Sequence, residues 1–386
     1  MTNRTITAAL TFALALSGCQ AARLNPPQDA EISADADFVV DESEIVVVTP
    51  SQLEARNLVR RASTLGYKVI ANDDLEGIGL TMLTLRIPAN QDGASAIREL
   101  EGLEPGITAG VNHAYVPQAQ ASGARSREYA PSLMRWRQSG CSTRMPIGVL
   151  DAKLVGPARA KVTTANFSRT NASEKALHGT QIVSLINDSG LLRAPRVFHA
   201  DVVSPNTKVG DTASVDSMLR GLNWMLSNNV RLINVSLAGP YNKILDRGFA
   251  NAARAGAVIV APAGNAGPRQ KVRYPAAFAS TIAVTAVDAN ARVYRNAVRG
   301  QRIDFSAPGV DVAIKLPQRR VYATGTSFAA PFVTMRIAAD PQLARMQRAS
   351  AIRKQLADSV ADLGPAGHDP VYGYGLIRAP QGCATS

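Results

Sequence analysis

Residues 231–265 read RLINVSLAGPYNKILDRGFANAARAGAVIVAPAGN. Two apolar stretches, Arg231–Leu237 and Val258–Ala261, lie on either side of a helical stretch, Leu245–Ala255. A strand, a helix and a second strand in this order are typical of a parallel sheet whose faces are covered by helices. This segment therefore predicts an α/β fold.

The same alternation continues towards the N-terminus. Residues 146–151 form another apolar strand, and residues 181–186 and 214–227 have the periodicity of helices. Ligands gather at the carboxyl ends of the strands in such sheets, so we expect the functional site at that edge. Three polar residues stand where expected strands end: Asp151, Asn234 and Asn265.

Four side chains provide the groups that nucleophilic cleavage of an amide requires. A serine hydroxyl needs a base to accept its proton, and the imidazole of histidine has a suitable pKa. An aspartate holds that imidazole in place, and a side-chain amide donates to the oxyanion that develops. Asp151, His178, Asn265 and Ser327 together supply each of these groups once.

Eight short motifs contain or accompany these residues: IGVLD at 147–151, HGT at 178–180, INVSLAG at 233–239, APAGN at 261–265, YPA at 274–276, DFSAPG at 304–309, GTSFAAP at 325–331 and YGYGLI at 372–377. With the chain order Asp, His, Ser, they resemble the subtilisin family of serine proteases (subtilases) over about residues 128–380. The resemblance implies a three-layer, subtilisin-like parallel sheet with helices on both faces over residues 145–380. It also implies a serine endopeptidase that hydrolyses protein or peptide substrates through an acyl-enzyme.

The resemblance assigns a role to each position. Ser327 resembles the nucleophile, His178 the general base and Asp151 the residue that orients the base. Asn265 resembles the amide donor of the oxyanion hole, together with the backbone N–H of Ser327. Four further residues resemble the edge that binds an extended substrate as an added strand: Ser236, Leu237, Ala238 and Gly239.

The sequence departs from the family pattern in two places. After Asp151 the family usually has Thr or Ser followed by Gly, whereas residues 152–153 here are Ala and Lys. After Pro331 the family commonly has His-Val-Ala-Gly, whereas residues 332–336 read FVTMR. Arg336 falls on a helix expected to be buried, where a charge needs a partner or a route to water. The alternative function is therefore a catalytically impaired, subtilase-fold lipoprotein that acts as a binding or scaffolding protein.

The first 18 residues resemble a bacterial lipoprotein signal peptide. The apolar stretch from Ile6 to Leu16 is too short for a permanent membrane span, and small residues precede Cys19 as in a lipobox. We expect lipidation of Cys19 and an acidic tether at residues 19–43. The protein would then be exported and anchored to the bacterial cell envelope, in the outer membrane or facing the periplasm. An ordinary signal peptide with a chance cysteine is the alternative.

Residues 44–117 have the pattern of a small α+β unit. Its strands are expected at 44–49, 67–71, 81–87 and 107–115, and its helices between Ser51 and Gly66 and at 94–103. The order β-α-β-β-α-β predicts a ferredoxin-like arrangement. The first helix is indicated by the helical spacing of Leu53, Leu58, Ala62 and Leu65.

In light of the resemblance, residues 44–117 are expected to be a prodomain, which assists folding, inhibits the protease and is then cut off. Residues 118–144 follow as a linker, and its first part is an accessible stretch for cleavage. Residues 1–116 carry net −7 and residues 117–386 carry net +19, which favours docking, mainly through the acidic tether. A permanent accessory domain is the alternative. A cut would separate the lipid anchor from the protease, so release, a bound prodomain and no cleavage all remain open.

Composition excludes several other classes. The chain of 386 residues has 46% hydrophobic residues and no apolar run of about 20, so neither a disordered chain nor a polytopic membrane protein is expected. The formal net charge is +12, but the arginines are scattered and no nucleic-acid motif occurs, so no nucleic-acid partner is expected.

Cysteine and metal chemistry give two further expectations. Cys141 and Cys383 lie near opposite ends of the region that resembles subtilases, and export to an oxidising compartment would allow them to form a disulfide. Two free thiols are the alternative. Neither the cysteines nor the histidines cluster at zinc spacing, and no acidic loop suits calcium, so no cofactor is expected and calcium would rest on the resemblance alone.

Overall fold

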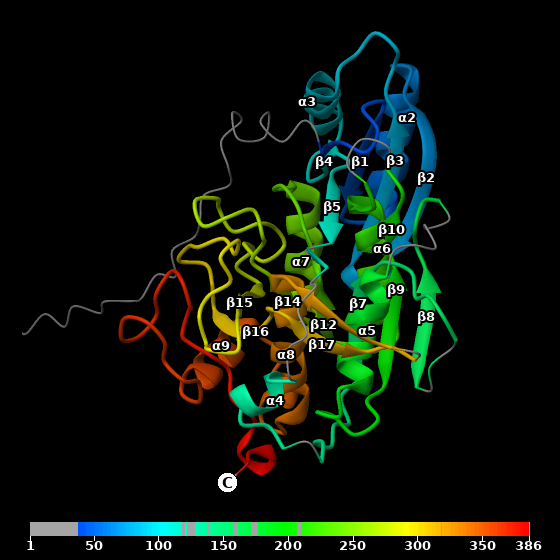
Figure 1. Cartoon of the computed structure of the whole chain (residues 1–386). Helices are drawn as coiled ribbons and strands as arrows, with labels where there is room; N and C mark the ends of the chain where they lie inside the picture. The colour runs from blue at the N-terminus through cyan, green and yellow to red at the C-terminus, as the bar shows by residue number, and fades with distance from the viewer. Residues whose placement is uncertain are drawn as a thin grey trace, which may run out of the picture.

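The structure is a computed structural model that describes residues 38–117, 120–121, 128–137, 139–157, 159, 161–170, 177–206, 210–317 and 319–385. The signal peptide, Cys19 and the tether up to residue 37 lie outside these residues, so the expectations about them stay predictions. We call residues 44–111 the N-terminal unit and residues 128–385 the C-terminal unit (Figure 1).

The N-terminal unit is a four-stranded antiparallel sheet in the order β2-β3-β1-β4 with two helices on one face. Its sequence order β-α-β-β-α-β and its strand order are those of the expected ferredoxin-like arrangement. The elements are β1 (Glu44–Thr49), α2 (Gln52–Thr64), β2 (Lys68–Leu75), a 3₁₀ turn (Glu76–Ile78), β3 (Leu80–Arg86), α3 (Gly93–Leu103) and β4 (Thr108–Val111).

Helix α2 begins as the sequence predicts, and its buried face carries only two of the four residues at helical spacing. Ser51 is the N-cap: its hydroxyl accepts the N–H of Leu53 and bonds the carboxylate of Glu54. Leu58 and Ala62 are buried, whereas Leu53 is 57% exposed and Leu65 is 43% exposed. The face that meets the sheet is centred on Leu58, and residues near the two ends of the helix rotate out of it.

The sheet of the N-terminal unit is buried on both faces. Alternate residues of β1 face α2 and α3, among them Ile45 and Val47, while Val46 and Val48 belong to a second core. That second core includes α6 (Val215–Ser227) and α7 (Lys243–Arg254) of the C-terminal unit. The N-terminal unit therefore packs its open sheet face on these two helices (Figure 1).

The stretch 107–115, expected to be one strand, is two strands in two different sheets. β4 pairs with β1, and the chain then passes Asn112 and His113 before β5 (Ala114–Pro117) begins. β5 lies between β11 (Thr212–Ser214) and β13 (Leu237–Ala238), antiparallel to both. The prediction of a single strand was wrong. The first half pairs within the sheet of the N-terminal unit and the second half pairs with strands of the C-terminal unit, and no local sequence pattern indicates such pairing.

The C-terminal unit is built on a seven-stranded sheet in the order β16-β15-β14-β12-β7-β9-β8, and every pairing in it is parallel. Its strands are β7 (Ile147–Asp151), β8 (Val162–Asn166), β9 (Val197–Asp201), β12 (Leu232–Val235), β14 (Val258–Pro262), β15 (Thr281–Val287) and β16 (Phe305–Pro308). The remaining strands form small sheets or edges: β6 (Gln120–Ala121), β10 (Val203–Ser204), β17 (Val312–Lys315) and β18 (Arg320–Thr324).

Helices cover both faces of this sheet. Successive residues of a strand point to opposite cores: Val149 packs with α5 (His178–Asp188) and α8 (Thr326–Ala339), and Leu150 packs with α6 and α7. The three-layer α/β architecture is therefore confirmed. The other helical segments are α4 (Ala130–Leu133), α9 (Ala349–Ala357) and the 3₁₀ turns Leu343–Arg345 and Gln381–Cys383.

Two further findings concern a disulfide and the possibility of a membrane-spanning helix. Cys141 and Cys383 are joined by a disulfide that ties the start of the C-terminal unit to its end. Within the described ranges, no helix has both the length and the apolar character needed to cross a bilayer.

Candidate active site

Asp151, His178 and Ser327 come from three elements and meet in one place. Asp151 is the last residue of β7, His178 the first of α5 and Ser327 the second of α8. His178 Nδ1 lies 2.6 Å from Asp151 Oδ1, and His178 Nε2 lies 3.1 Å from Ser327 Oγ. Both contacts are within hydrogen-bond range, so the three side chains form one connected chain of donors and acceptors.

The aspartate determines which ring nitrogen of His178 carries the proton in the neutral imidazole. A carboxylate only accepts, so the proton of the ring is on Nδ1, and Nε2 has a free lone pair towards Ser327. The Ser327 hydroxyl can therefore donate to Nε2. This is the orientation in which an imidazole takes a proton from an attacking hydroxyl.

The residue after Asp151 fixes the carboxylate. The Ala152 N–H donates to Asp151 Oδ1 at 2.7 Å, and the Ala152 carbonyl accepts from His199 Nε2 at 2.9 Å. A side chain at Gly179 would stand 1.8 Å from that same carbonyl oxygen, so glycine is required there for His178 to approach. His199 is buried, and burial lowers its pKa to about 4, so it stays neutral while it donates.

Lys153, one of the residues that depart from the family pattern, interacts with a carboxylate on the neighbouring strand. Asp201 stands opposite Asp151 in the β7–β9 register. Burial raises the pKa of Asp201 to about 6, and the nearby charge of Asp151 adds to the rise, while the Lys153 cation opposes it. The positive charge of Lys153 thus opposes the rise in the pKa of Asp201, the second carboxylate at this end of the sheet.

Asn265 follows β14 and is held by the residue before the serine. The N–H and the hydroxyl of Thr326 both donate to Asn265 Oδ1, at 3.0 and 2.9 Å. These two bonds identify Oδ1, so the other end of the amide is the Nδ2 donor. Ser327 itself stands at the N-terminus of α8, where backbone N–H groups and the helix dipole favour negative charge.

The four residues expected to form the substrate edge make different contacts. Leu237 and Ala238 form β13, which pairs with Pro117 and Val116 of β5. The backbone of Gly239 bonds Tyr274 in both directions, and the hydroxyl of Ser236 donates to the Ser327 carbonyl at 3.1 Å. The edge is therefore occupied by the chain's own residues 116–117.

The next described residues, 120–121, pair with the strand that leads to the serine. β6 pairs with β18, where Gln120 is opposite Thr324, three residues before Ser327. Residues 116–117 are thus paired with β13, which follows Ser236, and residues 120–121 with β18, which ends three residues before Ser327. Sequence reasoning did not find this self-pairing, and the signal available was the short apolar run of β5 directly before the expected linker.

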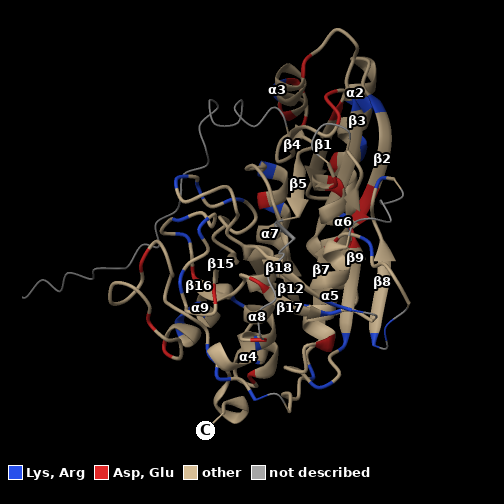
Figure 2. Cartoon of the chain, in the orientation of Figure 1, with Lys and Arg blue, Asp and Glu red and all other residues tan. Residues whose placement is uncertain are grey.

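Acidic residues of the N-terminal unit pair with basic residues of the C-terminal unit (Figure 2). Arg169 Nη2 lies 2.5 Å from Glu44 Oε2, and Arg220 Nη2 lies 3.0 Å from Asp73 Oδ2. Lys243 reaches Glu101 at 2.6 Å. These three ion pairs come from the folded sheet unit. The charge of the tether, to which the sequence assigned most of the docking, stays a prediction because most of the tether lies outside the described residues.

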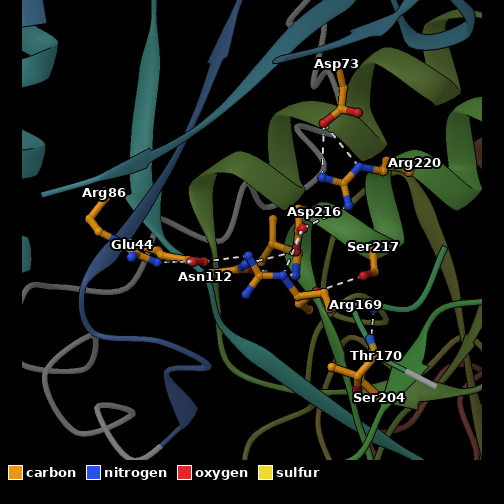
Figure 3. A network of polar contacts seen from close by, with 12 residues as sticks. Glu44, Asp73, Arg86, Asn112, Arg169, Thr170, Ser204, Asp216, Ser217 and Arg220 are labelled. Carbon is orange, nitrogen blue, oxygen red and sulfur yellow. Dashed lines mark hydrogen bonds and ion pairs between the residues drawn. The ribbon is translucent and has the colours of Figure 1, made fainter. Parts of the chain in front are cut away.

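The two arginines also share a carboxylate of their own unit (Figure 3). Asp216, in the first turn of α6, accepts from Arg220 Nη1 at 3.0 Å and lies 3.4 Å from Arg169 Nε. Burial opposes its ionisation, yet the two guanidiniums hold its pKa below the ordinary value. Asn112 joins the same network: its amide donates to Asp216 and its Oδ1 accepts the Val215 N–H, each at 2.9 Å.

The buried cation of α8 has its partners. Arg336 donates to Asp340 at 2.7 Å and to the Arg378 carbonyl at 2.7 Å, near the C-terminal end of the helix where a cation is favourable. The expectation that this charge needs a carboxylate is confirmed. The departure is therefore accommodated without disturbing the first turn of α8.

Comparison with known proteins gives the family. The model described as "Subtilase family" matches residues 156–375, which contain His178, Asn265 and Ser327, while Asp151 lies just before them. The chain belongs to the subtilase family. The resemblance seen in the motifs is thereby confirmed for the greater part of the chain.

Individual subtilases are similar over a comparable span. The minor extracellular protease Epr of Bacillus subtilis is 27% identical over 237 residues, which are 59% of this chain and 35% of that protein. The thermostable alkaline protease of Halalkalibacterium halodurans is 30% identical over 231 residues, or 59% of this chain and 62% of that protein. Subtilisin DY of Bacillus licheniformis is 32% identical over 238 residues and is covered to 83%.

Among solved structures, fervidolysin from Fervidobacterium pennivorans has the same fold, with a TM-score of 0.70 and 19% identity. The similarity covers 88% of this chain and 60% of that one. The chain thus spans only part of the length of several of its relatives. Within the residues that the structure describes, no three His, Cys, Asp or Glu side chains gather as metal ligands would.

Proposed function

We propose that the protein is a serine endopeptidase. The observation that carries the proposal is the connected series Asp151–His178–Ser327, with contacts of 2.6 and 3.1 Å, in a chain that belongs to the subtilase family. Ser327 is the nucleophile, His178 the base and Asp151 the orienting carboxylate.

The chemistry follows from the proton positions. Ser327 Oγ attacks the carbonyl carbon of the scissile peptide while its proton moves to His178 Nε2. Asp151 stabilises the imidazolium that results. The C–N bond then breaks, and His178 returns the proton to the leaving amine, which gives an acyl-enzyme. A water molecule, deprotonated by His178, attacks the acyl carbon. The bond from that carbon to Ser327 Oγ then breaks and His178 returns the proton to Oγ, which releases the carboxylic acid and the free serine.

The negative charge of both tetrahedral intermediates requires donors at the carbonyl oxygen. Asn265 Nδ2 and the Ser327 N–H are the proposed donors, because Thr326 holds the other end of the amide. Donors that are fixed before the reaction need no reorganisation when charge develops. Thr326 therefore acts on the oxyanion through Asn265.

We propose further that residues 44–117 are an inhibitory prodomain and that peptide substrates bind where β5 now lies. The pairing of Val116 and Pro117 with Ala238 and Leu237 supports this role, since it places two residues of the chain where a substrate strand would add. Self-cleavage is then expected shortly after Pro117. Protein segments or peptides in extended conformation are the substrate class.

Export is the proposed location, as for the relative whose name calls it extracellular. Lipidation at Cys19 would hold the protein at the cell envelope, and a cut after Pro117 would detach the C-terminal unit from that anchor. The Cys141–Cys383 disulfide agrees with an oxidising compartment.

Intact mass over time tests the proposal. Residues 20–386 and the same protein with Ser327→Ala would be purified and incubated side by side. We expect the wild type to convert into two fragments with a boundary shortly after Pro117, and the variant to keep its full mass. An unchanged wild-type mass together with no peptide hydrolysis would instead support the impaired binding protein.

A further inference from the structure

Helix α8 contains a proline where the nucleophile needs a hydrogen bond. In an α-helix the carbonyl of residue i accepts the N–H of residue i+4. For Ser327 that residue is Pro331, which has no N–H. Ser327 is fully buried, so its carbonyl needs a donor from elsewhere.

That donor comes from outside the helix. The Ser236 hydroxyl lies 3.1 Å from the Ser327 carbonyl oxygen, in place of the missing N–H. Ser236 stands between β12 and β13, so its bond connects the strand edge to the residue that bears the nucleophile.

Two further buried side chains set the direction of this bond. Asn234 Nδ2 donates to Ser236 Oγ at 2.7 Å, which leaves the hydroxyl proton of Ser236 for the Ser327 carbonyl. The hydroxyl of Thr334 lies 3.2 Å from Asn234 Oδ1 and 3.1 Å from the Ala330 carbonyl. The Thr334 hydroxyl has one proton for these two acceptors. Because Asn234 Nδ2 donates to Ser236, the Oδ1 end faces Thr334 and takes that proton, while the helix supplies a backbone N–H to the Ala330 carbonyl.

The opposite orientation of the amide would break the connection. With Asn234 turned over, Ser236 would donate to Asn234 and would no longer donate to Ser327. All three side chains are fully buried, so no solvent competes for these bonds. Thr334 also occupies a place where the family commonly has alanine, so this part of the network comes from one of the sequence departures noted above.

We propose that Thr334, Asn234 and Ser236 are positioning residues that hold the Ser327 carbonyl, and with it the first turn of α8, in the geometry the reaction needs. The proposal rests on the proposed peptidase function. None of the three touches a reacting atom through this network, so the effect falls on the rate of attack rather than on substrate binding.

The test compares Thr334→Val with Thr334→Ser in the full chain, incubated until its mass is constant. Valine keeps the shape and removes the donor, whereas serine keeps the donor. Thr285→Val is the matched control, because Thr285 is equally buried and its hydroxyl has no partner among the described residues. The readouts are kcat and KM for a peptide and the rate of labelling by a fluorophosphonate.

We expect Thr334→Val to lower kcat and the labelling rate by about 10-fold or more with KM nearly unchanged, since small misplacements of a nucleophile cost up to about 10²-fold. Thr334→Ser and Thr285→Val should stay near the wild type. Equal losses in Thr334→Val and Thr285→Val, or no loss in either, would overturn the proposal.

Two further outcomes have their own readout. If Thr334→Val does not fold, Ser236→Ala removes the same bond with a smaller change, and an unchanged kcat there overturns the proposal. If the wild type neither cleaves nor labels, the peptidase function fails, and crystal structures of Thr334→Val and Thr334→Ser decide about positioning. A Ser327 carbonyl displaced only in the valine variant supports the network, and an unmoved carbonyl contradicts it.

Discussion

Acid should loosen the contact between the N-terminal unit and the C-terminal unit through one histidine. His113 lies between β4 and β5 and is only 3% exposed. Its Nδ1 is 3.1 Å from the side-chain amide nitrogen of Asn242. Asn242 is the N-cap of α7, and its Oδ1 accepts the N–H groups of Ile244 and Leu245.

The helix cap therefore decides the state of the histidine. With Oδ1 bound to two N–H groups, Asn242 presents its NH₂ to His113, so Nδ1 must accept and the ring must be neutral. Protonation would turn two N–H donors towards each other. Burial lowers the pKa of His113 to about 4, below its ordinary value of 6.5.

The sign and size of the effect follow from that shift. The folded pKa is depressed, so stability is complete above about pH 6.5 and is lost as the pH falls towards 4. At about 1.4 kcal/mol per pKa unit, the whole shift corresponds to about 3 kcal/mol, of which about 2 kcal/mol is lost between about pH 7.5 and about pH 5.

Denaturant unfolding of the full chain in the Ser327→Ala background measures this without self-digestion. His199 titrates in the same direction and Asp201 in the opposite one, so the His113 part is the difference between that protein and its His113→Gln variant. We expect His113→Gln to lose about 2 kcal/mol less stability on acidification. Identical pH dependence of the two proteins would refute the assignment of a buried, neutral His113.

Three further predictions follow from the contacts. Asn265→Ala should lower kcat by about 10²–10³-fold with little change in KM, because the oxyanion loses one donor; steady-state kinetics on a peptide check it, and a loss confined to KM would speak against the role. Asp73→Ala and Arg220→Ala should couple by about 0.5–1 kcal/mol, measured at low salt as a double-mutant cycle of the free energy of unfolding. Additive effects of the two substitutions would show that this partly exposed ion pair between the units contributes nothing. Replacing Cys141 and Cys383 by Ser should destabilise the protein by up to about 5 kcal/mol, since the bond closes a loop with a sequence separation of 242; an unchanged thermal unfolding midpoint under non-reducing conditions would contradict it.

The motifs made much of the C-terminal unit predictable. The apolar runs ending at Asp151 and Val235 are strands of the parallel sheet. Such strands are buried on both faces, so they are apolar throughout and can be predicted without an alternating pattern. Asp151 and His178 are 27 residues apart and Ser327 is 149 further on, so no local pattern brings them together. Their meeting followed from the fold that the motifs implied.

What the sequence could not provide depends on packing between distant segments. The division of residues 107–115 into β4 and β5 requires knowledge of which sheet each half joins, although the polar pair at 112–113 inside an apolar run was a usable sign. The partner of Arg336 could have been predicted, since Asp340 lies four residues later, at the C-cap of the same helix. The sequence contained one indication of the bond from Ser236 to Ser327, namely the proline at position 331, which has no N–H to donate to the Ser327 carbonyl.

Covalent labelling by a fluorophosphonate, mapped by peptide mass spectrometry, tests most directly whether Ser327 is an activated nucleophile. The wild type should carry one adduct, on Ser327. His178→Ala should react far more slowly because the hydroxyl then has no base. An unlabelled wild type, or an adduct that persists in Ser327→Ala, would contradict the account.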